Sequence, residues 1–455
     1  MCLKKALIAL IVCSSTSSSV AAIKTFTGPG NFSDATKWGG TLPIANDTLR
    51  IDGICTNDNA AANLIYGTLQ VGRNANGTLV WPVGGTNTLR VTGILATAAA
   101  STGTIDMTNG GTLSIGATGW TTTRQTFIPG AGTIIWGTTA ATTWPATAAF
   151  ATFNNLTIAT TAITTTLGAA TTINGNLTLT SGTLAASTFP ITVKGNWYDN
   201  GGTFTPSTTA AVIFNGSNAQ TIGGFSATSF RNLAISNNSA IVSAVTNLNV
   251  SGTMTIGPGA IFSPLADKTI NNAAAAGTLT GSGTLRVTRT AVTADLVNQY
   301  KFTTYNLSAL TVEYVGAGNQ TVNNTAGVYN NLILSGSGIK TLQGAVTNNG
   351  ALTISTGVIL ADAGFVLTAK GNVANAGTHN GAGKILLAGT ASQTLSGAGA
   401  YGNVEVSNNS DILLTGSPTV NGALTLTTGH INTQTDQLNL ASGATVARTS
   451  GWVNG

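Results

Sequence analysis

Carboxylates are the first residues to consider, because an enzyme that cuts polysaccharides needs two or three of them close together to bind calcium or to transfer protons. The chain has only two glutamates, Glu313 and Glu405, and they lie in different repeats. The closest aspartates, Asp47 and Asp52, belong to the segment that precedes the repeats. We therefore assign no catalytic residue and predict that the protein is not an enzyme.

Histidine and cysteine do not form a recognisable metal-binding pattern. His379 and His430 are far apart in the sequence and have no neighbouring cysteine or carboxylate, so no zinc site is predicted and both are expected in turns. Cys2 and Cys13 fall in the leader described below, which leaves Cys55 as a small buried apolar residue. No metal-ligating or cofactor-binding residue is assigned, and no phosphate-binding G-x-x-x-x-G-K-[ST] motif occurs.

A recurring phrase offers a different chemistry, the stacking of sugars on aromatic rings. The chain reads FNNLTI from 153, FRNLAI from 230, YNNLIL from 329 and YGNVEV from 401. The four aromatics are too far apart for one ligand to bridge, so burial at the start of a strand is the favoured interpretation. The asparagine in third place then marks a structural corner, and each copy is expected to have low exposure and a backbone partner: Asn155, Asn232, Asn331 and Asn403.

Three more phrases recur in fixed order around these copies. INGNLTLTSGTLAA from 173 has relatives that start at 250, 348 and 420, and VIFNGSNAQTIGG from 212 has relatives at 312 and 385 and a degenerate one, GTIIWGTTAATTWP, from 132. KGNWYDNGGTFTP from 194 and KGNVANAGTHNGAG from 370 close two of the sets. About four degenerate modules therefore fill residues 132–455, with starts near 132, 212, 312 and 385.

The phrases have the period of short strands. Leu177 and Leu179 flank a threonine, and the same alternation occurs in the other copies, as expected for half-buried strands separated by Asn-Gly, Ser-Gly and Gly-Gly turns. Like phrases return after about 20 residues, which favours a right-handed parallel β-helix of about 20 residues per rung and on the order of 100 Å in length. Tandem small β-sandwiches are the alternative.

The segment KTFTGPGNFSDATKWGGTLPIANDTLRIDG, from Lys24 to Gly53, precedes the repeats. Its order G-x-F-S-D-x-x-x-W-G-G-x-x-P resembles the entry segment of large bacterial surface proteins with a β-helical mature part. The modules likewise resemble the strand repeats of filamentous haemagglutinins and autotransporter passengers. The resemblance implies an exported, elongated surface or adhesive protein and names no ligand.

The same segment has a physical interpretation of its own. The first rung of a solenoid is an open edge that must be covered to prevent pairing with other chains. Trp38 and Phe32 are expected to lie over the end of the core, and Pro43 removes a donor from the edge. An aromatic platform for sugars at Trp38 is the alternative. We assign residues 23–65 to this N-terminal cap and residues 66–131 to the first solenoid rungs.

Residues 1–22 have the layout of a secretory signal peptide, with Lys4 and Lys5 before a short apolar core. Charged residues make up 7% of the chain, and the formal charge of +5 falls to +3 without these two lysines, so no nucleic-acid partner is predicted. No stretch is apolar for long enough to span a membrane. We expect the chain to be truncated at its C-terminus, with a translocator or sorting domain outside it.

These observations predict a secreted or cell-surface structural or adhesive protein that acts through an elongated β-solenoid. Its expected partner is a host or neighbouring cell surface or an extracellular polysaccharide. The alternative is a β-helix that binds or degrades polysaccharides. An ice-binding solenoid, suggested by Thr-x-Thr strands such as Thr178 to Thr180, and an S-layer-type coat protein are further alternatives.

Overall fold

The computed structural model describes residues 20–61, 63–95, 101–121, 123–145 and 147–455. Residues 1–19, most of the predicted signal peptide, lie outside the described residues. Strands dominate the described chain, and its helices are three short ones: η1 (Ala35–Trp38), η2 (Ala148–Phe150) and α1 (Asp295–Gln299). The fold is therefore all-β, as predicted.

One parallel sheet runs the whole length of the molecule. Each of its main strands pairs with the next in parallel orientation, one rung further along the chain. In chain order they are β1 (Ile23–Thr27), β3 (Thr48–Asp52), β5 (Ile65–Val71), β7 (Thr88–Leu95), β9 (Thr112–Trp120), β11 (Thr133–Trp136), β14 (Asn155–Thr166), β16 (Leu177–Ala185), β18 (Trp197–Asp199), β21 (Gln220–Gly224), β24 (Ile241–Ala244), β27 (Ile261–Phe262), β29 (Thr284–Val287), β31 (Thr311–Tyr314), β33 (Asn331–Leu334), β36 (Leu352–Ile354), β39 (Val373–Asn375), β42 (Gln393–Ser396), β45 (Ile412–Thr415), β48 (His430–Asn432) and β51 (Trp452–Asn454).

Shorter parallel sheets form the other faces of the coil. An eight-stranded sheet comprises β13 (Thr152–Phe153), β15 (Thr171–Ile173), β17 (Ile191–Val193), β20 (Ala211–Phe214), β23 (Asn232–Ile235), β26 (Thr253–Ile256), β28 (Thr278–Gly281) and β30 (Thr304–Tyr305). A six-stranded sheet nearer the C-terminus comprises β35 (Val346–Asn348), β38 (Val366–Ala369), β41 (Lys384–Leu387), β44 (Val404–Ser407), β47 (Ala423–Thr428) and β50 (Thr445–Arg448).

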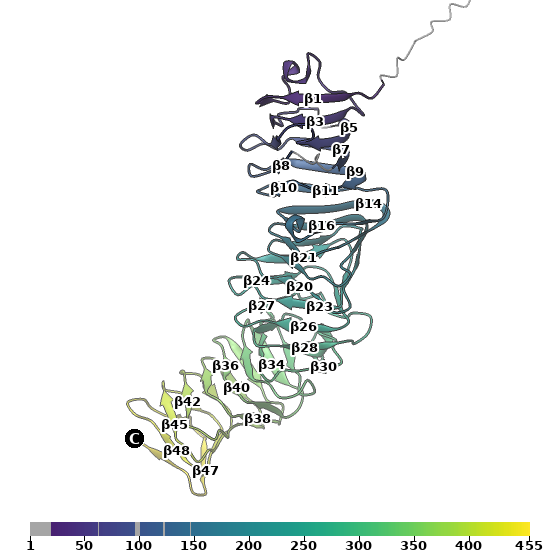
Figure 1. Cartoon of the computed structure of the whole chain (residues 1–455). Helices are drawn as coiled ribbons and strands as arrows, with labels where there is room; N and C mark the ends of the chain where they lie inside the picture. The colour runs from purple at the N-terminus through teal and green to yellow at the C-terminus, as the bar shows by residue number, and fades with distance from the viewer. Residues whose placement is uncertain (1–19, 62, 96–100, 122, 146) are drawn as a thin grey trace, which may run out of the picture.

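The coil has about 20 turns of about 21 residues each, which confirms the predicted parallel β-solenoid. All strand pairs in the described chain are parallel, so the alternative of tandem antiparallel sandwiches is wrong. Figure 1 shows the strands stacked along one elongated body, from β1 at one end to β47 and β48 at the other. The stack changes direction in the region of β28 to β38, the part of the chain that contains α1.

Alternation of apolar and polar residues builds the core. Leu177 and Leu179 are buried while Thr178 between them is half-buried, and the same pattern holds in β23, β26 and β36. In parallel pairing, like residues stack directly on one another, as Leu156 does on Leu177. The buried apolar side chains form a continuous column, and each fully buried Leu or Ile contributes about 1.5–3 kcal/mol to stability.

Each module occupies four or five consecutive rungs on one face. The strands of the first module are β11, β14, β16 and β18, and those of the third are β31, β33, β36 and β39, all in the long sheet. The second module occupies β20, β23, β26, β28 and β30 in the eight-stranded sheet, and the fourth occupies β41, β44, β47 and β50 in the six-stranded sheet. Successive modules therefore begin at different corners of a rung.

Candidate functional site

The four repeated aromatics are core residues. Phe153, Phe230, Tyr329 and Tyr401 are at most 1% exposed. No ring face is available to a ligand at these positions. The predicted burial at the start of a strand is therefore confirmed, and the alternative of a sugar-stacking platform is wrong.

The repeated asparagines join one rung to the next. In each copy Oδ1 accepts a hydrogen bond from a backbone N–H of the following rung, which confirms the predicted backbone partner. The side chains are half-buried rather than fully buried. The N–H donors belong to Asn176 for Asn155 (2.8 Å), Thr253 for Asn232 (3.0 Å), Ala351 for Asn331 (2.8 Å) and Ala423 for Asn403 (2.8 Å).

The first module extends this contact over successive rungs. Asn176 Oδ1 accepts from the N–H of Asn196 at 2.9 Å, and Asn196 Oδ1 accepts from the N–H of Thr221 at 2.7 Å. The four asparagines of the repeated phrase are too far apart to form one ladder, as predicted, but other asparagines continue the column locally. The column supplies hydrogen bonds between rungs without using charge.

A second corner was missed by the sequence analysis. Gln220, in the Q-T-I part of its phrase, is 1% exposed. Its Nε2 donates to the carbonyls of Val193 (3.0 Å) and Gly195 (2.6 Å) one rung earlier, and its Oε1 accepts from the N–H of Gly216 (2.9 Å). Gln320 and Gln393 make the same three hydrogen bonds in the third and fourth modules. We call this arrangement the glutamine corner.

Each glutamine corner includes a further donor to Oε1. Asn237 Nδ2 donates to Gln220 at 3.1 Å, and Asn408 Nδ2 donates to Gln393 at 2.9 Å. The third module has Gly336 at the asparagine position, and Lys340 from the adjoining strand donates to Gln320 instead. The recurrence of Gln-Thr at a fixed place in three phrases was the signal that could have revealed this corner.

The prediction that both histidines lie in turns is wrong. His379 is in β40 (Thr378–Asn380) and His430 is in β48. Each contacts a carboxylate: His379 Nε2 lies 2.9 Å from Asp362 and His430 Nε2 lies 2.6 Å from Asp411. A rung of about 21 residues brings together residues that are about one rung apart in sequence, which explains why a search for nearby carboxylates along the chain missed both pairs.

The His379 pair is sealed inside the solenoid. Both side chains are fully buried. The Nδ1 atom of His379 accepts from the N–H of Gly402 at 3.3 Å, and Asp362 also accepts from the N–H groups of Gly364 and Gly383 at 2.8 Å. Burial lowers the pKa of His379, although the hydrogen bond with Asp362 opposes this shift. The pair has the composition of a proton-transfer dyad but no solvent access, so we assign it a structural role.

Both glutamates form ion pairs between adjacent rungs. Glu313 accepts from Arg286 Nε at 2.8 Å. Glu405 pairs with Lys384, and this hydrogen bond lowers the pKa of the carboxyl group. The two glutamates lie in different modules, as the sequence indicated, and the structure places them on different sheets.

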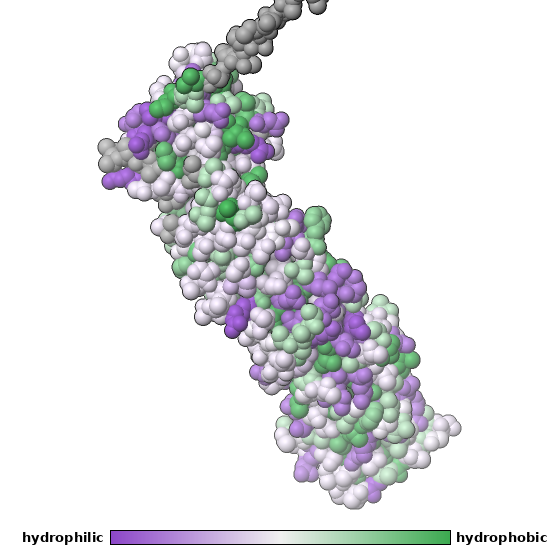
Figure 2. Space-filling model, turned by 90° about the vertical axis from the view of Figure 1, so that its right-hand side faces the viewer, coloured by the Kyte–Doolittle hydropathy of each residue, from purple (hydrophilic) through white to green (hydrophobic). Residues whose placement is uncertain are grey.

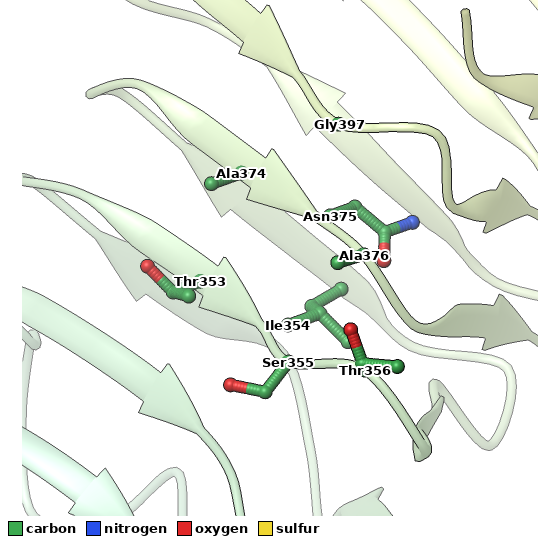
Figure 3. Close-up of a pocket in the computed structure, with 8 residues that line it drawn as sticks. All are labelled: Thr353, Ile354, Ser355, Thr356, Ala374, Asn375, Ala376 and Gly397. Atoms are coloured by element: carbon green, nitrogen blue, oxygen red, sulfur yellow. The ribbon is translucent and has the colours of Figure 1, made fainter. Parts of the chain in front are cut away.

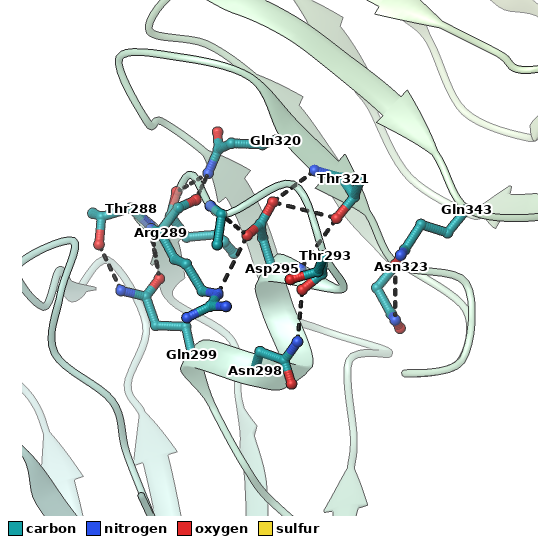
Figure 4. A network of polar contacts seen from close by, with 12 residues as sticks. Thr288, Arg289, Thr293, Asp295, Asn298, Gln299, Gln320, Thr321, Asn323 and Gln343 are labelled. Atoms are coloured by element: carbon teal, nitrogen blue, oxygen red, sulfur yellow. Dashed lines mark hydrogen bonds and ion pairs between the residues drawn. The ribbon is translucent and has the colours of Figure 1, made fainter.

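A network of polar contacts surrounds α1 (Figure 4). Asp295 is fully buried and accepts from the N–H groups of Thr321 (2.7 Å) and Ala291 (3.1 Å), and Arg289 Nε lies 3.4 Å from it. Gln299 Oε1 accepts from the N–H groups of Thr288 and Arg289. These contacts hold α1 against β29 and β32 (Gln320–Val322), at the place where the stack changes direction in Figure 1.

The N-terminal aromatics cover the first rung as predicted. Trp38 and Phe32 are each 3% exposed, and Trp38 packs edge-on against Phe26 and Phe32 with ring centroids 5.1 and 5.0 Å away. Trp38 Nε1 donates to the carbonyl of Phe32 at 2.7 Å. The burial of Trp38 rules against the alternative of an exposed sugar platform at this position.

The remaining predicted residues have structural surroundings. Asp47 accepts from the N–H groups of Ala22 and Ile44, and Asp52 accepts from that of Arg73. Cys55 is fully buried, as expected, and burial raises the pKa of its thiol far above its usual value. Within the described ranges, no three residues among His, Cys, Asp and Glu gather where they could hold a metal ion.

A surface groove of about 290 Å³ lies along the third module (Figure 3). It is lined by small and uncharged residues of β36, β39 and the turns that follow them, among them Thr353, Ser355 and Asn375. No side chain of Asp, Glu, His, Cys, Lys or Tyr lines it, so it offers no general acid or base.

Comparison of the chain with models of known families, with curated proteins and with solved structures finds no match. In the part of the chain that the structure describes, no helix has the length and apolar character needed to cross a membrane. Function must therefore be inferred from the architecture and its surfaces.

Proposed function

We propose that the protein is a secreted or cell-surface structural or adhesive component that acts through its elongated β-solenoid, without catalysis. The observation that carries this proposal is the uninterrupted parallel pairing from β1 to β51, which makes the molecule one long stack. At about 4.8 Å between rungs, about 20 rungs extend over about 100 Å. Such a shape suits a protein that spans a distance or presents a long surface.

The chemistry of the surface supports the same role. Charged residues are only 7% of the chain and form few ion pairs, and asparagine side chains add uncharged hydrogen bonds to the backbone of adjacent rungs. Figure 2 shows a face on which residues of intermediate hydropathy predominate, with separate hydrophilic patches. A rod of this kind resists changes in salt concentration, because few of its contacts are screened by ions.

Surface exposure and adhesion can be tested together. The chain, expressed with its leader, should become accessible to an added protease on intact cells, and a leaderless version (residues 1–22 removed) should stay protected. Beads coated with the mature chain should adhere to cell or polysaccharide surfaces more than beads coated with a charge-matched globular protein. Protection of the full chain on intact cells, together with a lack of adhesion by the beads, would contradict the proposal.

A further inference from the structure

The first module lacks the glutamine corner. When its degenerate phrase GTIIWGTTAATTWP is aligned with VIFNGSNAQTI, Thr142 takes the place of Gln220. Thr160 takes the place of Asn237, the partner of that glutamine. Trp136 replaces Phe214 on the same alignment. Two amide side chains, one of them a long glutamine, are therefore replaced by threonines in one corner of the solenoid.

The structure has a cavity of about 210 Å³ at this corner. Thr121 and Thr143 at its edge are exposed to solvent. No charged side chain contributes to the lining, which includes three tryptophans and three threonines: Trp120, Trp136, Trp144, Thr121, Thr142 and Thr143.

Unpartnered polar atoms concentrate around the cavity. Eleven buried side-chain polar atoms in the described chain have no hydrogen-bond partner, and five of them belong to this corner. Each such atom costs about 1–3 kcal/mol if it stays unpaired, and native structures contain few of them. The five atoms are the indole nitrogens of Trp136 and Trp144 and the hydroxyl oxygens of Thr138, Thr142 and Thr165.

The tryptophans form a preorganised aromatic wall. Trp136 and Trp144 stack with ring centroids 3.7 Å apart and planes inclined by 10°. Trp120 lies 6.1 Å from Trp144 and packs edge-on against Phe127 and Phe150. Trp136 and Trp144 are at most 2% exposed, so a ligand in the cavity would reach their ring faces and N–H groups only after these side chains shift.

We propose that this corner, which we call the tryptophan pocket, binds a single neutral sugar residue. Aromatic rings contact the C–H faces of a sugar, threonine hydroxyls and indole N–H groups pair with its hydroxyls, and the lack of charge in the lining disfavours acidic or cationic ligands. The volume suits one ring rather than a chain. Because the unpartnered indole and Thr142 atoms are covered, binding requires small shifts of these side chains.

The proposal deepens the proposed surface role by naming a ligand class, a neutral sugar that is either free or at the end of a glycan. Saturation-transfer NMR with neutral methyl glycosides measures binding of a free sugar. Calorimetry with neutral oligosaccharides measures binding of a sugar at the end of a glycan. We expect saturable binding with a Kd of about millimolar for a single residue, from the usual efficiency of small ligands. Binding of oligosaccharides alone would assign the pocket to glycan ends, and binding of the methyl glycosides with equal affinity would assign it to any sugar of that type.

The fourfold repeat supplies a matched variant. Thr142→Gln restores the residue found in the other three modules and should fill the pocket, which lowers affinity at least about tenfold. Thr139→Gln makes the same change at an exposed position three residues away and should leave binding unchanged. If Thr142→Gln does not fold, Trp144→Phe provides a second test, since it removes an N–H that has no partner in the protein and should weaken binding about threefold to tenfold.

Lack of saturable binding by the natural chain would overturn the proposal, and so would equal binding by the natural chain and Thr142→Gln. Neither result bears on the protease accessibility of the rod on intact cells. The sugar-binding proposal can therefore be rejected without rejecting the proposed surface role, and the reverse also holds.

Discussion

The Nζ atom of Lys340 lies 2.7 Å from Oε1 of Gln320 and donates a hydrogen bond to it inside the solenoid. The same amine donates to the carbonyls of Gly316 and Gly318. In the second and fourth modules an asparagine amide fulfils this function for Gln220 and Gln393. A buried amine in one module and a buried amide in two others thus donate the equivalent hydrogen bond to a glutamine oxygen at a solenoid corner.

The glutamine corner should be among the most sensitive positions in the rod. Gln220→Ala removes four hydrogen bonds and leaves the carbonyls of Val193 and Gly195, the N–H of Gly216 and the amide of Asn237 without that partner. We therefore expect a loss of about 3 kcal/mol in unfolding free energy. Urea unfolding measures the loss, and Gln437→Ala, at an exposed position, is the control. A double-mutant cycle with Asn237→Ala should show coupling of about 1 kcal/mol, and additive effects would contradict the corner as a unit.

Lys340 should make stability depend on pH in the alkaline range. Burial lowers the pKa of Lys340 to about 8 in the folded protein, from 10.5. Between pH 8 and 10.5 the unfolded chain therefore binds more protons than the folded chain, so stability rises with pH. Relative to Lys340→Met, which does not titrate, the natural chain should gain about 1 kcal/mol per pH unit across this window. Parallel unfolding curves for the two proteins at all pH values would show that the amine is not perturbed.

The solenoid, its strands and many of its core residues could be predicted from the sequence. The contacts between rungs could not, for a physical reason. Period-two alternation and turn pairs define strands locally, so residues such as Leu177 and Phe153 could be placed in the core from their neighbours alone. Contacts between rungs join residues about 21 positions apart, as His379 is joined to Asp362. No local pattern shows which of several residues at that spacing will meet, so the histidine pairs, the glutamine corners and the network around Asp295 emerged only in three dimensions.

The asparagine column should depend on its acceptor oxygens. Asn176→Ala leaves the N–H of Asn196 without its partner and should cost about 1–2 kcal/mol. Asn176→Asp retains an oxygen at this position and should recover most of the loss at neutral pH. Thermal unfolding of the three proteins measures the effect. Equal stability of the alanine and natural proteins would mean that water replaces the side chain at no cost.

Trp38 should stabilise the first rungs more than the rest of the rod, because a repeat structure can open from its ends. Trp38→Ala removes a large buried ring and should cost about 3–5 kcal/mol, whereas Trp38→Phe keeps the aromatic contacts with Phe26 and Phe32 and should cost less. Hydrogen exchange of β1 and β3 should accelerate in the alanine variant while that of β36 and β39 stays unchanged. Uniform acceleration along the chain would instead indicate that the rod unfolds as one cooperative unit.

His379 should make the C-terminal half of the rod sensitive to acid. Burial holds the pKa of His379 below 6.5 in the folded protein, against the opposing effect of Asp362. Between the folded pKa and 6.5 the unfolded chain therefore binds more protons, so stability falls as pH falls through this window. We expect stability to decrease as the pH is lowered below 6.5, measured by hydrogen exchange of β40 and by urea unfolding.

Two variants separate two effects on the pH dependence of stability, the burial of the imidazole and its contact with Asp362. His379→Gln does not titrate and should lose the slope between pH 6.5 and 5. Asp362→Asn keeps the imidazole buried but removes the carboxylate that raises its pKa, so the folded pKa should fall further and the slope should steepen. A shallower slope in Asp362→Asn would mean that the charged pair, rather than a neutral buried imidazole, is the folded form. In that case the protonated histidine would stabilise the rod, and acid sensitivity would have to come from the carboxylates.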